Sequence, residues 1–176
     1  RKYTSADAGT YTLRPYAVKE FAMRWYLVAY CLERKALRVY GLDRIHEMEV
    51  TDRRFRMPKD FDIDELFATS FGIYIPEEKG KTIIFRTTSK EAKFLRDLPI
   101  HSSQKELSAG DVRKRLPGIM VKPDECCFEI FVCPNTALIM EFCKHGSRLE
   151  VLSPAHVREA VATELHRASA LYAGEP

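Results

Sequence analysis

The first third of the chain alternates between hydrophobic and polar positions in the manner of β-strands. Two runs dense in aromatic and β-branched residues, 24–32 and 36–45, flank the charged segment 33–35, and this arrangement predicts a hairpin. Both faces of the first run are apolar, so we expect a central strand with Trp25 buried in the core. Residues 11–21 have a β-forming composition and should supply the strand or strand pair that leads into the hairpin.

Two further patterns follow the hairpin. Residues 46–50 and 54–57 again alternate hydrophobic with polar side chains, so each segment is predicted to form a short strand. Asp62 then precedes a hydrophobic run and has Glu65 three residues after it, a spacing typical of the first turn of a helix. The N-terminal part of the chain is therefore expected to be rich in β-strands and to end in a helix.

A break in the hydrophobic pattern predicts a domain boundary. Between Pro76 and Lys81 charge, proline and glycine coincide and the periodicity stops, which is typical of a linker. We therefore predict a first domain over residues 1–76, a linker over residues 77–81 and a second domain over residues 82–176.

The second domain shows strand and helix patterns in the order β-α-β-β-α-β, followed by a last helix. This order is that of a ferredoxin-like domain, in which two helices cover one face of an antiparallel sheet. Ser153 is the expected cap of the last helix, with Pro154 at its first position. Residues 108–124 are predicted to form a polar loop. Its basic cluster, Arg113, Lys114 and Arg115, is either solvated or available to phosphates or a subunit partner.

Arginines share a strand face with aromatic and aliphatic side chains in the second half of the hairpin. A period of two places Arg38, Tyr40 and Arg44 on the same face. Because an unpaired arginine is costly to bury, such a face is a solvated edge, an internal ion pair or a groove for an anion. The simplest interpretation pairs Arg38 and Arg44 with Glu33 or Asp43 at the rim of the sheet.

An ordered set of motifs resembles a known family. RWYL at residues 24–27 is preceded by PYAVKEF at 15–21 and followed by RVYGLDRI at 38–45 and FDIDELFATSFGI at 61–73. This combination resembles the WYL domain, the sensor module of many bacterial transcription regulators, over residues 11–75. The resemblance implies a small Sm-like or SH3-like β-barrel with a basic cleft for a nucleotide, an oligonucleotide or a similar anion. The second half is similar, in its order of elements, to the WCX domain that commonly follows this barrel. The expected fold class is therefore mixed α+β.

Five residues of the hairpin are the candidate ligand-binding set. A suitable strand register could bring Arg24 and Tyr26 beside Arg38, Tyr40 and Arg44. Guanidinium groups bind phosphate in a bidentate manner and aromatic rings stack on bases, so this mixture suits a nucleotide or single-stranded nucleic acid. Whether Arg24 lies on the same face as Arg38 depends on the register of the two strands.

Composition narrows the possible partners and the compartment. The chain has 28 basic and 25 acidic residues among 176, so the net charge of +3 is slight and any anion site must be local. The apolar runs are too short to span a membrane, and the N-terminus lacks the apolar core of a signal peptide. Five cysteines without a secretory signal indicate reduced thiols. We expect a cytoplasmic protein that does not bind membranes.

The residue types of metal sites and enzymes occur without the usual spacings. Cys126 and Cys127 are adjacent on a predicted strand and so point to opposite faces, which argues against a zinc site with Cys133, Cys143 or His145. Motifs for nucleophilic catalysis, metalloprotease chemistry and phosphate or dinucleotide binding are missing from the sequence. We therefore predict no metal, no cofactor and no enzymatic activity.

These observations lead to a functional hypothesis. The chain starts at Arg1 rather than at methionine and lacks a helix pair of the helix-turn-helix kind, so we expect the sensing fragment of a larger regulator. An anionic effector would bind the cleft, and operator DNA would be bound only through an N-terminal domain outside this sequence. Relatives in the family suggest a homodimer. The alternatives are a stand-alone module that binds RNA or single-stranded DNA, and an enzyme of unrecognised type.

Overall fold

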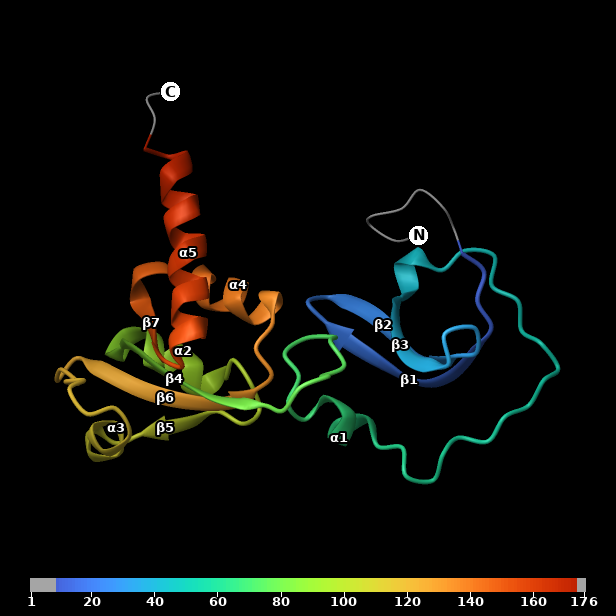
Figure 1. Cartoon of the computed structure of the whole chain (residues 1–176), viewed down its shortest axis with the longest axis horizontal. Helices are drawn as coiled ribbons and strands as arrows, with labels where there is room; N and C mark the ends of the chain where they lie inside the picture. Colours follow the sequence, from blue (N-terminus) through green and yellow to red (C-terminus); the bar gives the residue numbers. More distant parts are fainter. Residues whose placement is uncertain (1–8, 174–176) are drawn as a thin grey trace. The chain divides into compact units, whose positions relative to one another are not determined.

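A computed structural model describes residues 9–173, which divide into two compact units between Glu77 and Glu78 (Figure 1). The first unit contains three strands, one turn of 3-10 helix and one short α-helix. In chain order these are β1 (Leu13–Phe21), β2 (Arg24–Cys31), β3 (Ala36–Gly41), η1 (Leu42–Arg44) and α1 (Ile63–Phe67).

The three strands form one antiparallel sheet in the order β1-β2-β3, with β2 in the centre. This arrangement confirms the predicted hairpin and the central position of its first strand. In the hairpin Ala29 pairs with Arg38 and Cys31 pairs with Ala36, so residues 32–35 form a four-residue loop. The second half of β2 is the core of the unit, because Val28, Ala29 and Cys31 are fully buried.

Two predictions for this unit are wrong. Residues 46–50 and 54–57 form no strand, and the chain from 45 to 62 contains neither helix nor sheet. Glu47 has a positive φ of 53°, which interrupts any extended run there. Trp25 is 57% exposed rather than buried, because it stands at the start of β2 where the sheet ends. Alternation along a strand predicts which side chains share a face but not whether that face is covered.

Aromatic side chains from the second half of the unit pack along β1. Tyr16, which interrupts the pairing of β1 with β2, lies 6.0 Å from Phe55 and 4.8 Å from Phe61, measured between ring centroids. Phe21 lies 5.9 Å from Phe71. These contacts hold the chain that leads into and out of α1 against the sheet. The side chain of Asp62 accepts hydrogen bonds from the backbone N–H groups of Asp64 and Glu65, which confirms the predicted start of α1.

The second unit is a four-stranded antiparallel sheet with helices packed on it. The strand order is β5-β6-β4-β7. The elements are β4 (Lys81–Thr88), α2 (Ser89–Asp97), β5 (Lys105–Leu107), α3 (Ala109–Arg115), β6 (Glu125–Val132), α4 (Thr136–Lys144), η2 (Gly146–Arg148), β7 (Leu149–Ser153) and α5 (Ala155–Leu171).

Two local predictions for this unit need correction. The segment predicted to be a polar loop contains α3, because the side chain of Ser108 accepts a hydrogen bond from the backbone N–H of Asp111 and caps the helix. The basic cluster at residues 113–115 is therefore the last turn of a helix. The last helix begins one residue later than predicted, at Ala155, with Pro154 in the cap position.

Phenylalanines from two strands and a helix make the centre of the second unit. Phe85 of β4 lies 5.7 Å from Phe128 of β6 and 5.6 Å from Phe142 of α4, and each is at most 1% exposed. Fully burying side chains of this size contributes about 1.5–3 kcal/mol each. This cluster joins α4 to the sheet.

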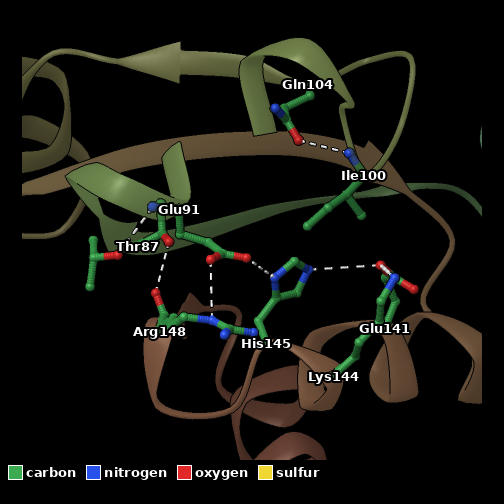
Figure 2. Close-up of polar contacts among 9 residues, drawn as sticks. Thr87, Glu91, Ile100, Gln104, Glu141, Lys144, His145 and Arg148 are labelled. Atoms are coloured by element: carbon green, nitrogen blue, oxygen red, sulfur yellow. Dashed lines mark hydrogen bonds and ion pairs between the residues drawn. The ribbon is translucent and has the colours of Figure 1, made fainter. Parts of the chain in front are cut away.

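A buried polar cluster, called the His145 clasp below, joins α2 to the end of α4 (Figure 2). His145 is 8% exposed; its Nδ1 lies 2.9 Å from Oε1 of Glu91, and its Nε2 lies 3.7 Å from Oε1 of Glu141. Arg148 completes the cluster, with Nε 3.1 Å from Oε2 of Glu91. The carboxylates of Glu141 and Glu91 raise the pKa of His145 above its ordinary value, against the opposing effect of burial.

Within residues 9–173, each helix is too short or too polar to cross a membrane.

Candidate ligand-binding hollow

A hollow of about 300 Å³ lies at the end of the first sheet, where β2 begins and the chain leaves β3. It is called the hairpin-end hollow below. Its walls combine an indole, a guanidinium, a carboxylate and two aliphatic side chains. The lining residues are Met23, Arg24, Trp25, Leu42 and Asp43.

One wall depends on a strained turn. Ala22 and Met23 connect β1 to β2 and have φ angles of 51° and 62°, a region that residues with a Cβ rarely adopt. Two-residue hairpins with positive φ are usually built from asparagine and glycine. The backbone N–H of Met23 donates a 2.7 Å hydrogen bond to Oε1 of Glu20, which holds the turn. The result is a methionine side chain that is 95% exposed beside the hollow.

The part of the wall that Leu42 and Asp43 form depends on a glycine. A Cβ atom on Gly41 would lie 2.8 Å from Oδ1 of Asp43 and 3.3 Å from Cδ of Arg44. The missing side chain lets η1 turn back tightly after β3. This turn places Leu42 and Asp43 beside the start of β2.

Arg24 and Asp43, which both line the hollow, form an ion pair. Their side chains are 46% and 47% exposed, so the pair is half in solvent. Pairs of this kind contribute about 0–1 kcal/mol, which is little enough for an incoming anion to compete with the carboxylate. Arginine has five N–H donors, so Arg24 can also bind a second acceptor while it keeps Asp43.

Trp25 gives the hollow a flat aromatic surface. Its side chain is 57% exposed, although tryptophan contributes most to stability when it is buried. Beside a guanidinium group, an exposed indole can stack on a planar ring while the guanidinium binds a charged group on the same ligand. The geometry therefore suits a small anion that carries an aromatic ring.

The register divides the five predicted ligand-binding residues between two faces of the sheet. Leu27 pairs with Tyr40 and Ala29 pairs with Arg38, so Arg38 and Tyr40 share a face with the odd-numbered residues of β2. Arg24 and Tyr26 therefore lie on the other face. Arg44 is the last residue of η1, outside the strands. The structure brings Arg24 to the hollow and does not bring all five residues together.

Arg38 and Tyr40, on the face opposite Arg24, have different polar surroundings from those of Arg24. The hydroxyl of Tyr40 is buried and has no hydrogen-bond partner of ordinary geometry among residues 9–173; burial and the neighbouring thiol of Cys31 raise its pKa. The ring of Tyr40 lies 6.2 Å from that of Tyr11. Arg38 is exposed, donates a 3.1 Å hydrogen bond to the carbonyl of Leu37, and has no carboxylate within 4.0 Å in the described part of the chain.

Four of the residues that line the hollow are not in the predicted ligand-binding set: Met23, Trp25, Leu42 and Asp43. The sequence pattern predicts that Trp25 is in the core and that Asp43 is a partner for Arg38 or Arg44. The sequence does contain a signal for Met23. Ala22 and Met23 connect two strands without glycine or asparagine, which indicates a strained turn, and strained turns often lie at functional sites.

Comparisons with known proteins found a family match and a curated relative. A family model described as "WYL domain" matches residues 1–50. A curated relative is the uncharacterized HTH-type transcriptional regulator YobV of Bacillus subtilis (strain 168), which is 28% identical over 173 residues. The match covers 97% of this chain and 50% of the relative, so the chain spans about half the length of that protein.

Two solved structures resemble the chain. One is described as the crystal structure of a CRISPR Cas-related protein, with a TM-score of 0.51, 17% identity, and coverage of 92% of this chain and 43% of that chain. The other is proteasome accessory factor B/C (PafBC) of Arthrobacter aurescens, with a TM-score of 0.40, 18% identity, and coverage of 92% and 22%. At these identities the first likeness concerns the fold alone. The family match and the motifs of the first hairpin agree, so residues 1–50 are similar to the WYL domain.

Proposed function

We propose that this chain is the effector-sensing part of a WYL-type transcriptional regulator and that its effector is an anion bound in the hairpin-end hollow. The observation that carries the proposal is the pairing of a half-exposed guanidinium, Arg24, with an exposed indole, Trp25, around one concavity. The name of the curated relative, a transcriptional regulator about twice as long, supports a regulatory role. A nucleotide or a short single strand of nucleic acid has both a phosphate and a planar ring.

The proposal includes a finer description of the fold. We infer that the first unit is an open Sm-like or SH3-like barrel and that the second is a ferredoxin-like domain of the WCX type. The strand order β5-β6-β4-β7 supports the second inference, because it corresponds to the order 2-3-1-4 within that unit. We keep the predicted boundaries, with domains over residues 1–76 and 82–176 and a linker over 77–81.

Within the candidate set, we assign the first contact with the effector to Arg24 together with Trp25. Tyr26 follows Arg24 on the same face of β2. Arg38, Tyr40 and Arg44 remain in the proposed set as contacts for a ligand that extends beyond the hollow. An alanine scan of these residues would show how far along the hairpin the ligand reaches.

The proposed mechanism is thermodynamic linkage. An effector changes operator affinity only if it binds two conformations of the regulator with different affinities. Here the effector would compete with Asp43 for Arg24 and so alter the position of η1. A helix-turn-helix domain in the part of the protein outside this chain would read that change. We expect such a regulator to act in the cytoplasm as a homodimer, without a cofactor and without catalytic turnover.

A thermal-shift screen against nucleotides and short oligonucleotides at two salt concentrations tests the proposal. Ligands that bind through phosphate should raise the melting temperature, and the effect should weaken as salt rises. Two exposed substitutions should act in opposite directions: Arg24→Gln removes the anion contact, whereas Asp43→Asn removes its competitor and should tighten binding. A ligand whose affinity is the same in both variants and in the unmodified protein would contradict the assignment to the hollow.

A further inference from the structure

A second basic surface lies in the loop between η1 and α1, outside the hairpin-end hollow. Residues 53–59, Arg-Arg-Phe-Arg-Met-Pro-Lys, carry four positive charges in seven positions. This segment is called the basic strap below. It has no regular secondary structure, every one of its residues is exposed, and it belongs to the open loop that leads into α1 in Figure 1. Loops of this length without secondary structure are often functional.

The arginines of the strap differ from most other arginines of the described chain. Ion pairs with nearby carboxylates engage seven of those arginines: Arg24, Arg86, Arg96, Arg115, Arg148, Arg158 and Arg167. Within residues 9–173, Arg53, Arg54 and Arg56 have no carboxylate within 4.0 Å. Asp52 and Asp60 are close in the sequence and still do not neutralise them. Three exposed arginines without an ion pair among the described residues therefore lie within four consecutive positions.

A ring contact anchors the strap to the sheet. Phe55, in the middle of the three arginines, stacks on Tyr16 of β1 with ring centroids 6.0 Å apart and an interplanar angle of 29°. Tyr16 also contacts Phe61, two residues after the strap, at 4.8 Å, so one ring of β1 contacts the chain within the strap and just beyond it. Anchoring reduces the conformational entropy that a ligand would otherwise have to remove from the loop. The ring contact of Phe55 thus holds the backbone between Arg54 and Arg56 near β1.

We propose that the basic strap binds the phosphate backbone of a nucleic acid strand. The guanidinium fork matches the geometry of a phosphate, and three of the four cations are arginines. Phe55 and Met57 are 37% and 48% exposed, which leaves apolar surface for contact with a base. The acidic residues that flank the strap, Asp52 and Asp60, repel a longer polyanion, so the contact spans only a few phosphates. This site goes beyond the proposed effector site and does not depend on it.

The test compares two variants with the same loss of charge. The strap variant is Arg53→Gln, Arg54→Gln and Arg56→Gln. The matched control is Lys90→Gln, Lys93→Gln and Lys122→Gln, which removes three exposed cations of the second unit that have no ion pair in the described chain. Binding of a fluorescently labelled thymidine oligonucleotide, and of a duplex of equal length, is measured by anisotropy at several salt concentrations.

The proposal predicts a specific change in the salt dependence. For a single strand the slope of log K against log salt is about −0.7 for each phosphate neutralised, so the strap variant should show a slope shallower by about 2 than the unmodified protein. The control variant should keep the original slope. The single-stranded and duplex probes show which form of the backbone the strap prefers.

Three results would overturn the proposal. Equal losses in the strap variant and the control would mean that only net charge matters. Equal binding to vesicles of anionic lipid would assign the strap to a membrane surface. Oligonucleotide binding that is abolished by Arg24→Gln but unchanged in the strap variant would assign the contact to the hollow, in which case the effector proposal stands and the strap proposal fails. An Arg→Lys triple variant, which keeps the charge and loses the fork, should retain the slope with weaker binding.

Discussion

The two units of this chain differ in how far their aromatic and charged side chains are exposed, although Phe67 and Phe71 of the first unit are also buried. In the second unit Phe85, Phe128 and Phe142 are at most 1% exposed. In the first unit the fully buried side chains are the smaller Val28, Ala29 and Cys31 of β2, and Trp25 is 57% exposed. At this exposure the indole of Trp25 contributes only part of the free energy that its full burial would add to folding. The central phenylalanines of the second unit therefore contribute burial energy to its core, whereas the indole of Trp25 is open to solvent and is available to the ligand that we propose.

The charges show the same contrast. In the second unit Arg86 lies between Glu125 and Glu150, and Arg158 pairs with Glu150 as well. In the first unit the arginines of the basic strap lack such partners within the described residues, and the pair that borders the hollow is half in solvent. Arginines with satisfied partners hold a fold together, whereas exposed arginines without them are available to ligands.

The largest expected effect comes from breaking the core of the second unit. Phe85→Ala removes a fully buried ring that contacts both Phe128 and Phe142, so the unfolding free energy of this unit should fall by about 3–5 kcal/mol. Denaturant titration followed by far-ultraviolet circular dichroism measures the loss. A loss below about 1 kcal/mol would mean that the cluster does not carry the stability of the unit.

The His145 clasp should make the stability of the second unit depend on pH. Because the pKa of folded His145 is raised above its ordinary 6.5, the stabilisation is fully present below about pH 6.5 and is lost as pH rises through the folded value. The pKa of Glu141 is lowered by its contact with His145, so the clasp also weakens when pH falls far enough to protonate that carboxylate. His145→Gln should flatten the fall in melting temperature above about pH 6.5. His166→Gln, at an exposed position of α5, is the control and should leave the fall in place.

A smaller effect is expected from relaxing the strained turn of the first unit. Replacing Ala22-Met23 by Asn-Gly supplies residues that favour positive φ, so the unit should gain about 1 kcal/mol. The same change removes the methionine from the wall of the hollow and should weaken effector binding. A variant whose unfolding free energy is unchanged would show that the turn is not strained.

The smallest expected effect on stability is that of Trp25→Ala. A buried tryptophan would cost about 3–5 kcal/mol to remove, but at 57% exposure we expect a change of about 0.5 kcal/mol. Binding of the effector should nevertheless be lost. The unfolding free energy and the ligand affinity, measured on the same preparation, separate the two roles. A large destabilisation would return Trp25 to the core and remove it from the proposed site.

Much of the local structure could be predicted from the sequence. Asp62 and Asn135 mark the starts of α1 and α4 as expected, because their side chains accept hydrogen bonds from the next turn. The apolar run of β2 indicated a central strand, and β2 is central. Ser108 caps α3 in the same way, and serine is a common cap residue. The surrounding glycines, prolines and charges nevertheless favour a loop, so the sequence did not predict this helix.

The composition of the site could not be predicted, for a geometric reason. With the four-residue loop 32–35, partners in the hairpin have residue numbers that sum to 67, as Cys31 with Ala36 does. An even-numbered residue of β2 therefore shares a face with an odd-numbered residue of β3, which separates Arg24 from Arg38. A loop shorter or longer by one residue would have brought these two arginines to the same face. Charged loop residues do not reveal the register of the strands that they connect.

Trp25 is the only tryptophan of the chain, and its place on the wall of the hollow allows a direct measurement. The tryptophan fluorescence of the unmodified protein can be followed during titration with each nucleotide or oligonucleotide that raises the melting temperature. The account predicts a saturable change in emission that weakens as salt rises and that disappears with Arg24→Gln. A ligand that stabilises the protein while the emission of Trp25 stays constant would place the anion site elsewhere and contradict the account.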